Sequence, residues 1–265
     1  MYANIKNLNF KYFNIDILKE ITFDVFEKEI ILLVGENGAG KTSLLRLVSG
    51  KNTAFDYDKF DIMGTNSPND QFGGIAYLGN NWTKSVSFAG HVPYMIDMEA
   101  GELMKKWQQE NKERRDELAQ VLEIDLSWNM NKISDGQRKR VQIMLGLMKP
   151  FKLLLIDEFT NDLDVVVRDN FFNYLKKESE ERNCSIIYAT HIFDNIDNFA
   201  THVLFMSNGK NQEKVTIDKF NTEKSLFYSV KKKILENKKD YQENKINKEL
   251  FGPQGGWSSG RGHLF

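Results

Sequence analysis

The chain has 265 residues, of which 41% are hydrophobic and 28% are charged, so it is long and apolar enough to form a buried core. Its net charge of −1 argues against a strongly basic nucleic-acid binder, and we expect no direct contact with nucleic acid. No run reaches the ~18 apolar residues of a transmembrane helix, so we expect no membrane insertion. The single Cys184 and the lack of an apolar leader predict a cytoplasmic location, with the nucleus as a further one.

The amino-terminal part predicts strands followed by a loop and a helix. Apolar and polar residues alternate over 5–10 and 21–26, which indicates antiparallel strands with one solvent-exposed face. Residues 30–34 are instead continuously apolar and indicate a fully buried strand. After the next loop, residues 44–48 predict a helix that ends near Gly50, and residues 75–78 predict a further strand.

The loop after the buried strand carries the pattern G-x-x-x-x-G-K-[ST], the P-loop. Backbone N–H groups at a helix start bind phosphates, Lys41 reaches the terminal phosphates, and the Thr42 hydroxyl is expected on Mg²⁺. The alternative, a glycine-rich turn without a ligand, is disfavoured because a buried strand precedes the loop and a helix follows it. The predicted phosphate-binding residues are Gly35, Glu36, Asn37, Gly38, Ala39, Gly40, Lys41, Thr42 and Ser43.

The middle of the chain predicts helices and one acidic strand end. Residues 102–124 are densely charged, with apolar residues at roughly helical spacing, which indicates one or two amphipathic surface helices. The turn-like run 133–137 opens a helix that continues to Lys149. Residues 153–156 predict a buried strand that ends at Asp157 and Glu158, on the sheet edge where ligands bind in open α/β sheets.

Three side chains at strand ends are candidates for chemistry. Asp157 is expected to hold Mg²⁺ through water, and Glu158 to orient or deprotonate the attacking water. An acidic pair of this kind is usually structural, but the P-loop favours the catalytic interpretation. His191 ends the following strand, over residues 184–189, and is predicted to sense the γ-phosphate, although a lone histidine is more often structural.

The carboxyl-terminal part predicts a helix over 165–179, a strand over 201–206 and then a change of composition. Residues 223–250 are rich in Lys, Glu and Asn and indicate a charged helical extension, and residues 252–265 indicate a flexible Gly- and Ser-rich tail. A solvated helix is favoured over a partner-binding one. The basic run at residues 231–233 is too short to predict an RNA site. Cys184 is expected to be a buried structural thiol.

Taken in order, residues 35–43, ISDGQ at 133–137, LLLIDE at 153–158, NDLD at 161–164 and His191 resemble an ATP-binding-cassette (ABC) ATPase domain. The resemblance implies an α/β P-loop NTPase core of ABC type over residues 1–222, with an antiparallel β-subdomain and a helical subdomain at about 83–150. It implies ATP and Mg²⁺ as cofactors, ATP hydrolysis, and a second ABC domain, most simply in a homodimer. Further residues with implied contacts to ATP are Tyr12 on adenine, Ser134, Gly136 and Gln137 on the partner's ATP, and Asp164 on the loop between the paired sites.

The match narrows to a branch of soluble eukaryotic ABC proteins without membrane domains, to which small plant proteins and a yeast ATPase associated with the deadenylase (NOT) complex belong. This implies an ATP-driven switch in a protein assembly linked to transcription or mRNA regulation. Two residues depart from the family pattern: Asn80 stands where a glutamine binds Mg²⁺, and Asp135 stands where the signature has glycine. The alternatives are the ATP-binding subunit of a transporter with separately encoded membrane subunits, and a non-enzymatic nucleotide-binding scaffold.

Overall fold

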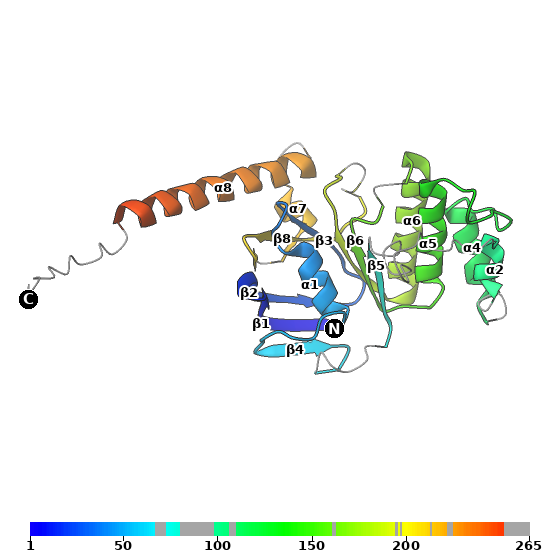
Figure 1. Ribbon diagram of the computed structural model, residues 1–265, viewed down its shortest axis with the longest axis horizontal. Helices are drawn as coiled ribbons and strands as arrows, with labels where there is room; N and C mark the ends of the chain where they lie inside the picture. The colour runs from blue at the N-terminus through cyan, green and yellow to red at the C-terminus, as the bar shows by residue number, and fades with distance from the viewer. Residues whose placement is uncertain are drawn as a thin grey trace, which may run out of the picture.

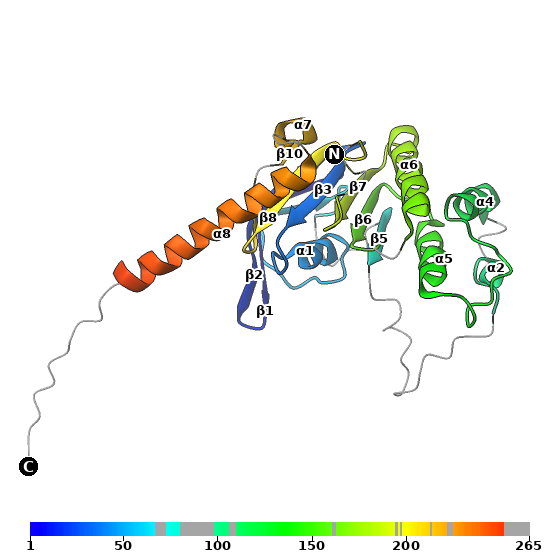
Figure 2. The ribbon, with the colours of Figure 1, turned by 90° about the horizontal axis from the view of Figure 1, so that it is seen from above.

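The computed structural model describes residues 1–66, 73–79, 98–105, 110–160, 163–193, 196, 198–212, 214–221 and 225–251, with side chains up to residue 238 in the last range. The described part forms two β-sheets, a group of helices beside the larger sheet, and one long carboxyl-terminal helix that projects away from the body (Figure 1, Figure 2).

The smaller sheet is antiparallel and lies at the amino terminus. Its strands are β1 (Ala3–Tyr12), β2 (Ile15–Val25) and β4 (Lys59–Ile62), in the order β2-β1-β4. Both contacts of β1 are antiparallel, and buried residues alternate with more exposed ones along β1 and β2. The antiparallel strands predicted from period-two alternation are therefore confirmed.

The larger sheet has the order β10-β8-β3-β7-β6-β5, with β9 paired to β8. The contacts among β8, β3, β7, β6 and β5 are parallel, so their carboxyl ends meet at one edge. Every residue of β3, β6 and β7 is buried, which explains why these strands are almost continuously apolar. The strands are β3 (Ile30–Gly35), β5 (Ile75–Gly79), β6 (Leu153–Asp157), β7 (Ser185–Ala189), β8 (His202–Ser207), β9 (Lys210–Asn211) and β10 (Val215–Thr216).

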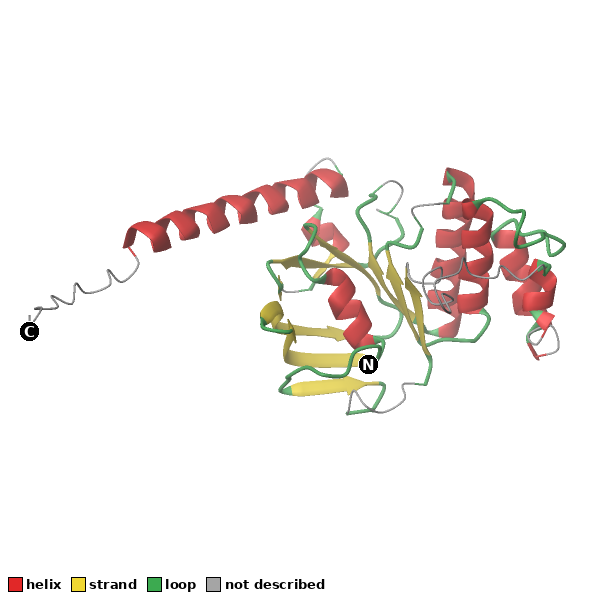
Figure 3. Cartoon of the chain, viewed as in Figure 1, coloured by secondary structure: helices red, strands yellow, loops and turns green. Residues whose placement is uncertain are grey.

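Helices cover both faces of this sheet (Figure 3). Each face has its own apolar core. The helix that follows the P-loop packs on one face and helices from the middle of the chain pack on the other. Alternate residues of β3 feed the two cores: Leu32 belongs to one and Leu33 to the other. The helices are α1 (Lys41–Val48), α2 (Ala100–Leu103), α4 (Lys112–Val121), α5 (Asp135–Leu147), α6 (Val165–Arg182), α7 (Ile217–Phe220) and α8 (Leu226–Phe251).

A buried arginine joins the helical lobe, which consists of α2, α4 and α5, to α6 of the core. Arg114 of α4 is 4% exposed, and its Nη2 lies 2.8 Å from Oε2 of Glu178 on α6. Its Nε donates a hydrogen bond of 2.6 Å to the Leu147 carbonyl at the end of α5. One guanidinium therefore connects α4, α5 and α6, which are labelled in Figure 1.

The predicted α/β P-loop core with an antiparallel sheet is confirmed by this arrangement. Cys184 is buried, and burial raises the pKa of its thiol to about 12, as expected for a structural rather than a reactive cysteine. The helix predicted over 165–179 continues to Arg182. Asn80 and the expected beginning of the helical subdomain near residue 83 lie outside the described residues, as does the tail from residue 252.

Candidate active site

The P-loop connects the carboxyl end of β3 to the first turn of α1. Gly40 occupies the last position before α1 and has φ 99°, a left-handed conformation that favours glycine. A Cβ at this position would lie 2.5 Å from Cδ2 of Leu18, so a larger residue would also have to displace this side chain. The sequence therefore forms a tight loop whose backbone amides gather at a helix start, where anions bind.

A cavity of about 470 Å³ lies over this loop. Its volume falls within the range of ~300–1,000 Å³ that is usual for ligand sites. It brings together predicted residues from the P-loop and from the ends of β6 and β7. Both strand ends are more than a hundred positions away from the P-loop in the sequence. The cavity is lined by Ile17, Asn37, Gly38, Ala39, Gly40, Lys41, Thr42, Ser43, Glu158 and His191.

Lys41 lines the cavity and is 5% exposed. It donates hydrogen bonds of 3.0 Å to the carbonyls of Gly35 and Glu36. Burial lowers the pKa of Lys41, and the carboxylates of Glu158 and Asp157 act in the opposite direction. The lysine is thus a desolvated charge beside the loop amides, suited to an anionic ligand.

Glu36 was predicted among the phosphate-binding residues, but its side chain is engaged elsewhere. Its carboxylate accepts a hydrogen bond of 3.1 Å from the Ser207 hydroxyl, and the residue does not line the cavity. Its contribution to the loop is its backbone, since its carbonyl accepts from Lys41.

Both carboxylate oxygens of Asp157 are held by hydroxyl groups. Oδ1 accepts a hydrogen bond of 3.0 Å from Thr42 and Oδ2 accepts one of 3.1 Å from Tyr77. Burial raises the pKa of Asp157, while these two hydrogen bonds lower it. The Thr42 hydroxyl and the Asp157 carboxylate are adjacent hard oxygen donors, the kind of ligand that Mg²⁺ uses when a phosphate substrate completes its coordination.

Glu158 and His191 face each other across the ends of β6 and β7. The distance from His191 Nε2 to Glu158 Oε1 is 2.7 Å, and both side chains are about one-third exposed to the cavity. Glu158 has φ 52°, which is uncommon for a residue other than glycine, and its N–H donates to the Ala189 carbonyl at 3.0 Å. This turn directs the carboxylate into the cavity instead of along the strand.

The predicted signature residues lie apart from this cavity. None of Ser134, Gly136 and Gln137 is among the described residues that line it. Ser134 Oγ accepts from the Gln137 N–H at 3.2 Å, and Gln137 Oε1 accepts from the Ser134 N–H at 2.9 Å, so together they cap the start of α5.

Asp135, which replaces the usual glycine of the signature, forms an ion pair with Arg138 one turn along α5. The distance from Asp135 Oδ1 to Arg138 Nη1 is 2.7 Å, although the aspartate side chain is 97% exposed. Arg138 Nη2 also lies 3.4 Å from the carbonyls of Met130 and Ile133, which anchors it. A fixed guanidinium therefore offsets the negative charge that this departure introduces.

Two further predicted residues have defined places. Asp164 caps α6 by accepting from the Val167 N–H at 3.0 Å, and it forms an ion pair with Arg140 of α5. The hydrogen bond from Val167 and the charge of Arg140 lower the pKa of Asp164. Tyr12 does not line the cavity; it is 42% exposed, and its hydroxyl accepts from Asn52 Nδ2 at 3.3 Å.

The structure adds two residues that the sequence did not suggest. Ile17 of β2 forms the apolar side of the cavity, and Tyr77 of β5 contacts Asp157. Tyr77 and Gly79 share a face of β5, and Gly79 pairs with Asp157 on β6, which brings the Tyr77 side chain to Asp157.

Comparison with known proteins identifies the family. The sequence model of the family described as ABC transporter matches residues 18–161. The chain is 39% identical to ABC transporter I family member 20 of Arabidopsis thaliana, over 92% of this chain and 80% of that protein. It is also 39% identical to CCR4-associated factor 16 of Saccharomyces cerevisiae, over 68% of this chain and 65% of that protein.

Solved structures show the same fold. An ATP-binding subunit of an ABC transporter superposes with a TM-score of 0.66 at 21% identity, over 83% of this chain and 92% of that one. The dimeric, post-hydrolysis structure of the cassette MJ0796 with ADP and Pi superposes with a TM-score of 0.65 at 20% identity, over 81% and 98%. Among the described residues, no helix has the length and apolar character needed to cross a bilayer. With the family match over residues 18–161 and relatives at 39% identity, the chain belongs to the ABC family and is an ATP-binding ATPase.

Proposed function

We propose that the chain hydrolyses Mg-ATP between two copies arranged head to tail, and that this cycle acts as a switch in a protein assembly linked to transcription or mRNA regulation. One observation carries the proposal. The P-loop, Glu158 and His191 line one cavity, whereas the signature residues at the start of α5 do not. The signature residues therefore have no ATP to contact within their own chain. A second copy would supply that ATP.

Within one copy, the described residues suit phosphoryl transfer to water. The loop amides and Lys41 would bind the β- and γ-phosphates, with Lys41 leaving its loop carbonyls for the phosphate oxygens. Thr42 and Asp157 would hold Mg²⁺, which neutralises phosphate charge when bound. Glu158 would orient the attacking water and take its proton, while His191 holds the Glu158 carboxylate and faces the γ-phosphate.

The dimer is supported by the exposed start of α5 and by structural similarity. Ser134 is exposed at the α5 amino terminus, and the partial positive charge of a helix start favours an anion. The similar cassette MJ0796 forms a dimer in its post-hydrolysis state with ADP and Pi. We propose that Ser134, Gly136 and Gln137 cap the ATP of the partner copy.

The assembly is proposed from one relative. CCR4-associated factor 16 is named for an association with CCR4, and it shares 39% identity with this chain. We therefore place the chain in a regulatory assembly of the cytoplasm or nucleus. The alternative, a subunit of a transporter with separate membrane subunits, is favoured by the names of the plant relatives. Retention on membranes after a high-salt wash without detergent would support the transporter.

The central test is gel filtration of the Glu158→Gln variant with and without Mg-ATP. The amide keeps the shape of the side chain but cannot accept a proton, so ATP should be bound and not consumed. We expect a monomer without ATP and a dimer with it, and phosphate release at least about 100-fold slower than in the unchanged chain. A monomer under both conditions contradicts the dimer. Equal phosphate release by the variant and the unchanged chain contradicts the role of Glu158.

A further inference from the structure

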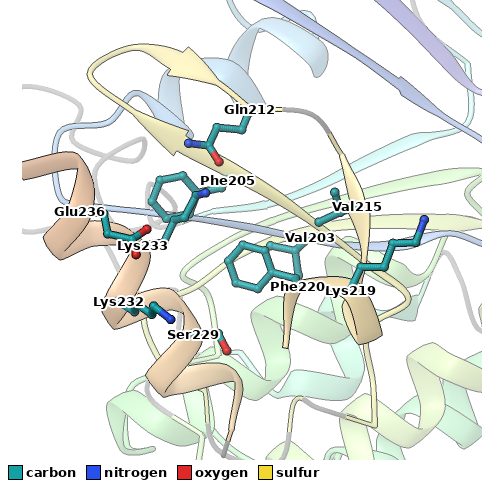
Figure 4. A pocket seen from close by; sticks show the side chains of 10 residues that line it. All are labelled: Val203, Phe205, Gln212, Val215, Lys219, Phe220, Ser229, Lys232, Lys233 and Glu236. Carbon is teal, nitrogen blue, oxygen red and sulfur yellow. The ribbon is translucent and has the colours of Figure 1, made fainter. Parts of the chain in front are cut away.

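A second cavity of about 340 Å³ lies between α8 and the edge of the large sheet (Figure 4). It shares no lining residue with the phosphate cavity. Its floor is apolar and consists of Val203, Phe205, Val215 and Phe220, from β8, β10 and α7. We call this cavity the α8 groove. Figure 2 shows that α8 leaves the body of the molecule and projects outward.

The sequence of α8 produces one wall of the groove. Leu226 and Val230 are 0% and 2% exposed and anchor the helix in the main core. The wall residues Ser229, Lys232, Lys233 and Glu236 follow at i, i+3, i+4 and i+7, which places them on one adjacent face. Leu226 and Val230 thus lie on the face of α8 that packs into the core, and the polar wall residues lie on a neighbouring face that borders the apolar floor.

Positive charge predominates around this floor. Lys233 extends from α8 toward Phe205, and Lys219 of α7 extends away from the floor (Figure 4). Lys232 of α8 is a further lysine of the lining. Glu236 is the acidic residue of the lining. A ligand that complements the groove has an apolar side chain for the two phenyl rings and a carboxylate for the lysines.

We propose that the α8 groove binds an acidic segment of a partner protein, which inserts one aromatic or aliphatic side chain onto the floor at Phe205 and Phe220. The volume lies near the lower limit of ~300 Å³ for ligand sites, so it suits a single anchor residue with a neighbouring carboxylate. A nucleic acid fits less well, because backbone binding needs a line of cations, and α8 contributes only two lysines to the lining beside the acidic Glu236.

The α8 groove would be the surface through which the proposed switch binds its partner. Its biological role rests on the proposed function, but peptide binding itself does not. Peptide binding is measured on the full chain without nucleotide, so either proposal can fail alone. Phage-displayed random peptides are selected on the full chain, and the enriched sequences are synthesised with fluorescein and titrated by fluorescence polarisation. We expect sequences with acidic residues beside an aromatic or aliphatic residue.

Two charge reversals on the same helix form the matched pair of variants. K232E/K233E places negative charge at the groove and should weaken peptide binding by about tenfold or more. K231E/K238E makes the same change at two exposed α8 residues that do not line the groove, and should stay within about twofold. Glu236→Gln removes the opposing charge and should strengthen binding by about two- to threefold.

The Glu236→Gln variant separates specific binding from misfolding, since an unfolded variant cannot bind more tightly. Peptides without acidic residues, or equal losses in K232E/K233E and K231E/K238E, overturn the proposal. A short single-stranded RNA that binds through Lys232 and Lys233, while acidic peptides do not, would assign the groove to nucleic acid and equally overturn it.

Discussion

The Tyr77 hydroxyl donates a hydrogen bond of 3.1 Å to Oδ2 of Asp157, the oxygen that Thr42 does not contact. The Tyr77 ring reaches Asp157 across Gly79, where a Cβ would lie only 2.4 Å from the ring. The ammonium of Lys51 lies 4.0 Å from the ring centroid and holds the ring from another side. The orientation of the carboxylate is therefore determined by two hydroxyl groups from different elements.

Replacing Tyr77 with phenylalanine should weaken Mg²⁺ binding without altering the fold. The ring and its contact with Lys51 remain, but Oδ2 of Asp157 loses its donor. Loss of a residue that orients a metal ligand costs about tenfold or more in metal affinity, so half-maximal ATPase rate should require about tenfold more Mg²⁺. Binding of a fluorescent ATP analogue over a Mg²⁺ titration measures the same shift without turnover.

Tyr57→Phe, at a partly exposed tyrosine of the amino-terminal part, is the matched control and should change neither titration. An unchanged Mg²⁺ requirement in Tyr77→Phe would show that Thr42 alone orients Asp157.

Asp157 should reduce the stability of the nucleotide-free chain at neutral pH. Burial raises the pKa of this carboxyl above its unfolded value, so the folded chain binds the proton more tightly than the unfolded chain does. The associated stability is present at low pH and is lost as the pH rises through the folded pKa. Asp157→Asn should therefore increase the free energy of unfolding at pH 7 by about 0.5–2 kcal/mol.

Urea unfolding without Mg²⁺ at about pH 4.5 and pH 7 measures this effect. The difference between Asp157→Asn and the unchanged chain should be larger at pH 7 than at pH 4.5. Asp169→Asn, at an exposed position of α6, should show no such difference. A less stable Asp157→Asn chain at pH 7 would mean that the hydrogen bonds from Thr42 and Tyr77 outweigh the cost of burial.

The features that the sequence predicted depend on local patterns. Residues 30–34 and 153–156 are continuously apolar because both faces of their strands are covered, and the P-loop is one contiguous motif. The contact between Tyr77 and Asp157 depends instead on the register of two strands that are 80 positions apart. No local pattern specifies such a register, so this part of the site was not predicted.

Helix ends show the same limit. The predicted helix over 165–179 continues through exposed residues to Arg182 and ends at Asn183, which has φ 55°. Within the helix, two polar residues near this end are buried. Glu178 pairs with Arg114, and the Ser179 hydroxyl donates to the Cys184 carbonyl at 3.0 Å. These tertiary contacts stabilise a charged segment that looks like a solvated end in the sequence alone.

The ion pair between Arg140 and Asp164 should couple the signature helix to the loop before α6. Arg140→Gln removes the guanidinium that joins α5 to the capping residue of α6. We expect the ATPase rate to fall by about tenfold with little change in ATP affinity, because the phosphate cavity is untouched. The elements that we propose face the partner copy would lose their mutual position. The measurement is kcat and KM at saturating Mg²⁺.

A double-mutant cycle with Asp164→Asn tests whether the pair itself is responsible. The two effects on kcat should be non-additive, with the double variant little worse than Arg140→Gln alone. Arg168→Gln, at the first turn of α6, should retain its rate. Additive losses would show that Arg140 and Asp164 act through separate contacts.

The buried pair of Arg114 and Glu178 should be the most sensitive point between the helical lobe and the core. Glu178→Ala leaves the guanidinium buried beside Leu147 without its carboxylate, which costs about 3–5 kcal/mol. Replacing both residues by apolar ones, Arg114→Met with Glu178→Leu, removes the two charges together and should cost less than Glu178→Ala alone. Urea unfolding gives both values, and reaction of the buried Cys184 thiol with a thiol reagent reports the opening of this region independently. If the double variant is less stable than Glu178→Ala, the attraction between Arg114 and Glu178 exceeds the free-energy cost of burying their charges, and the pair stabilises the lobe.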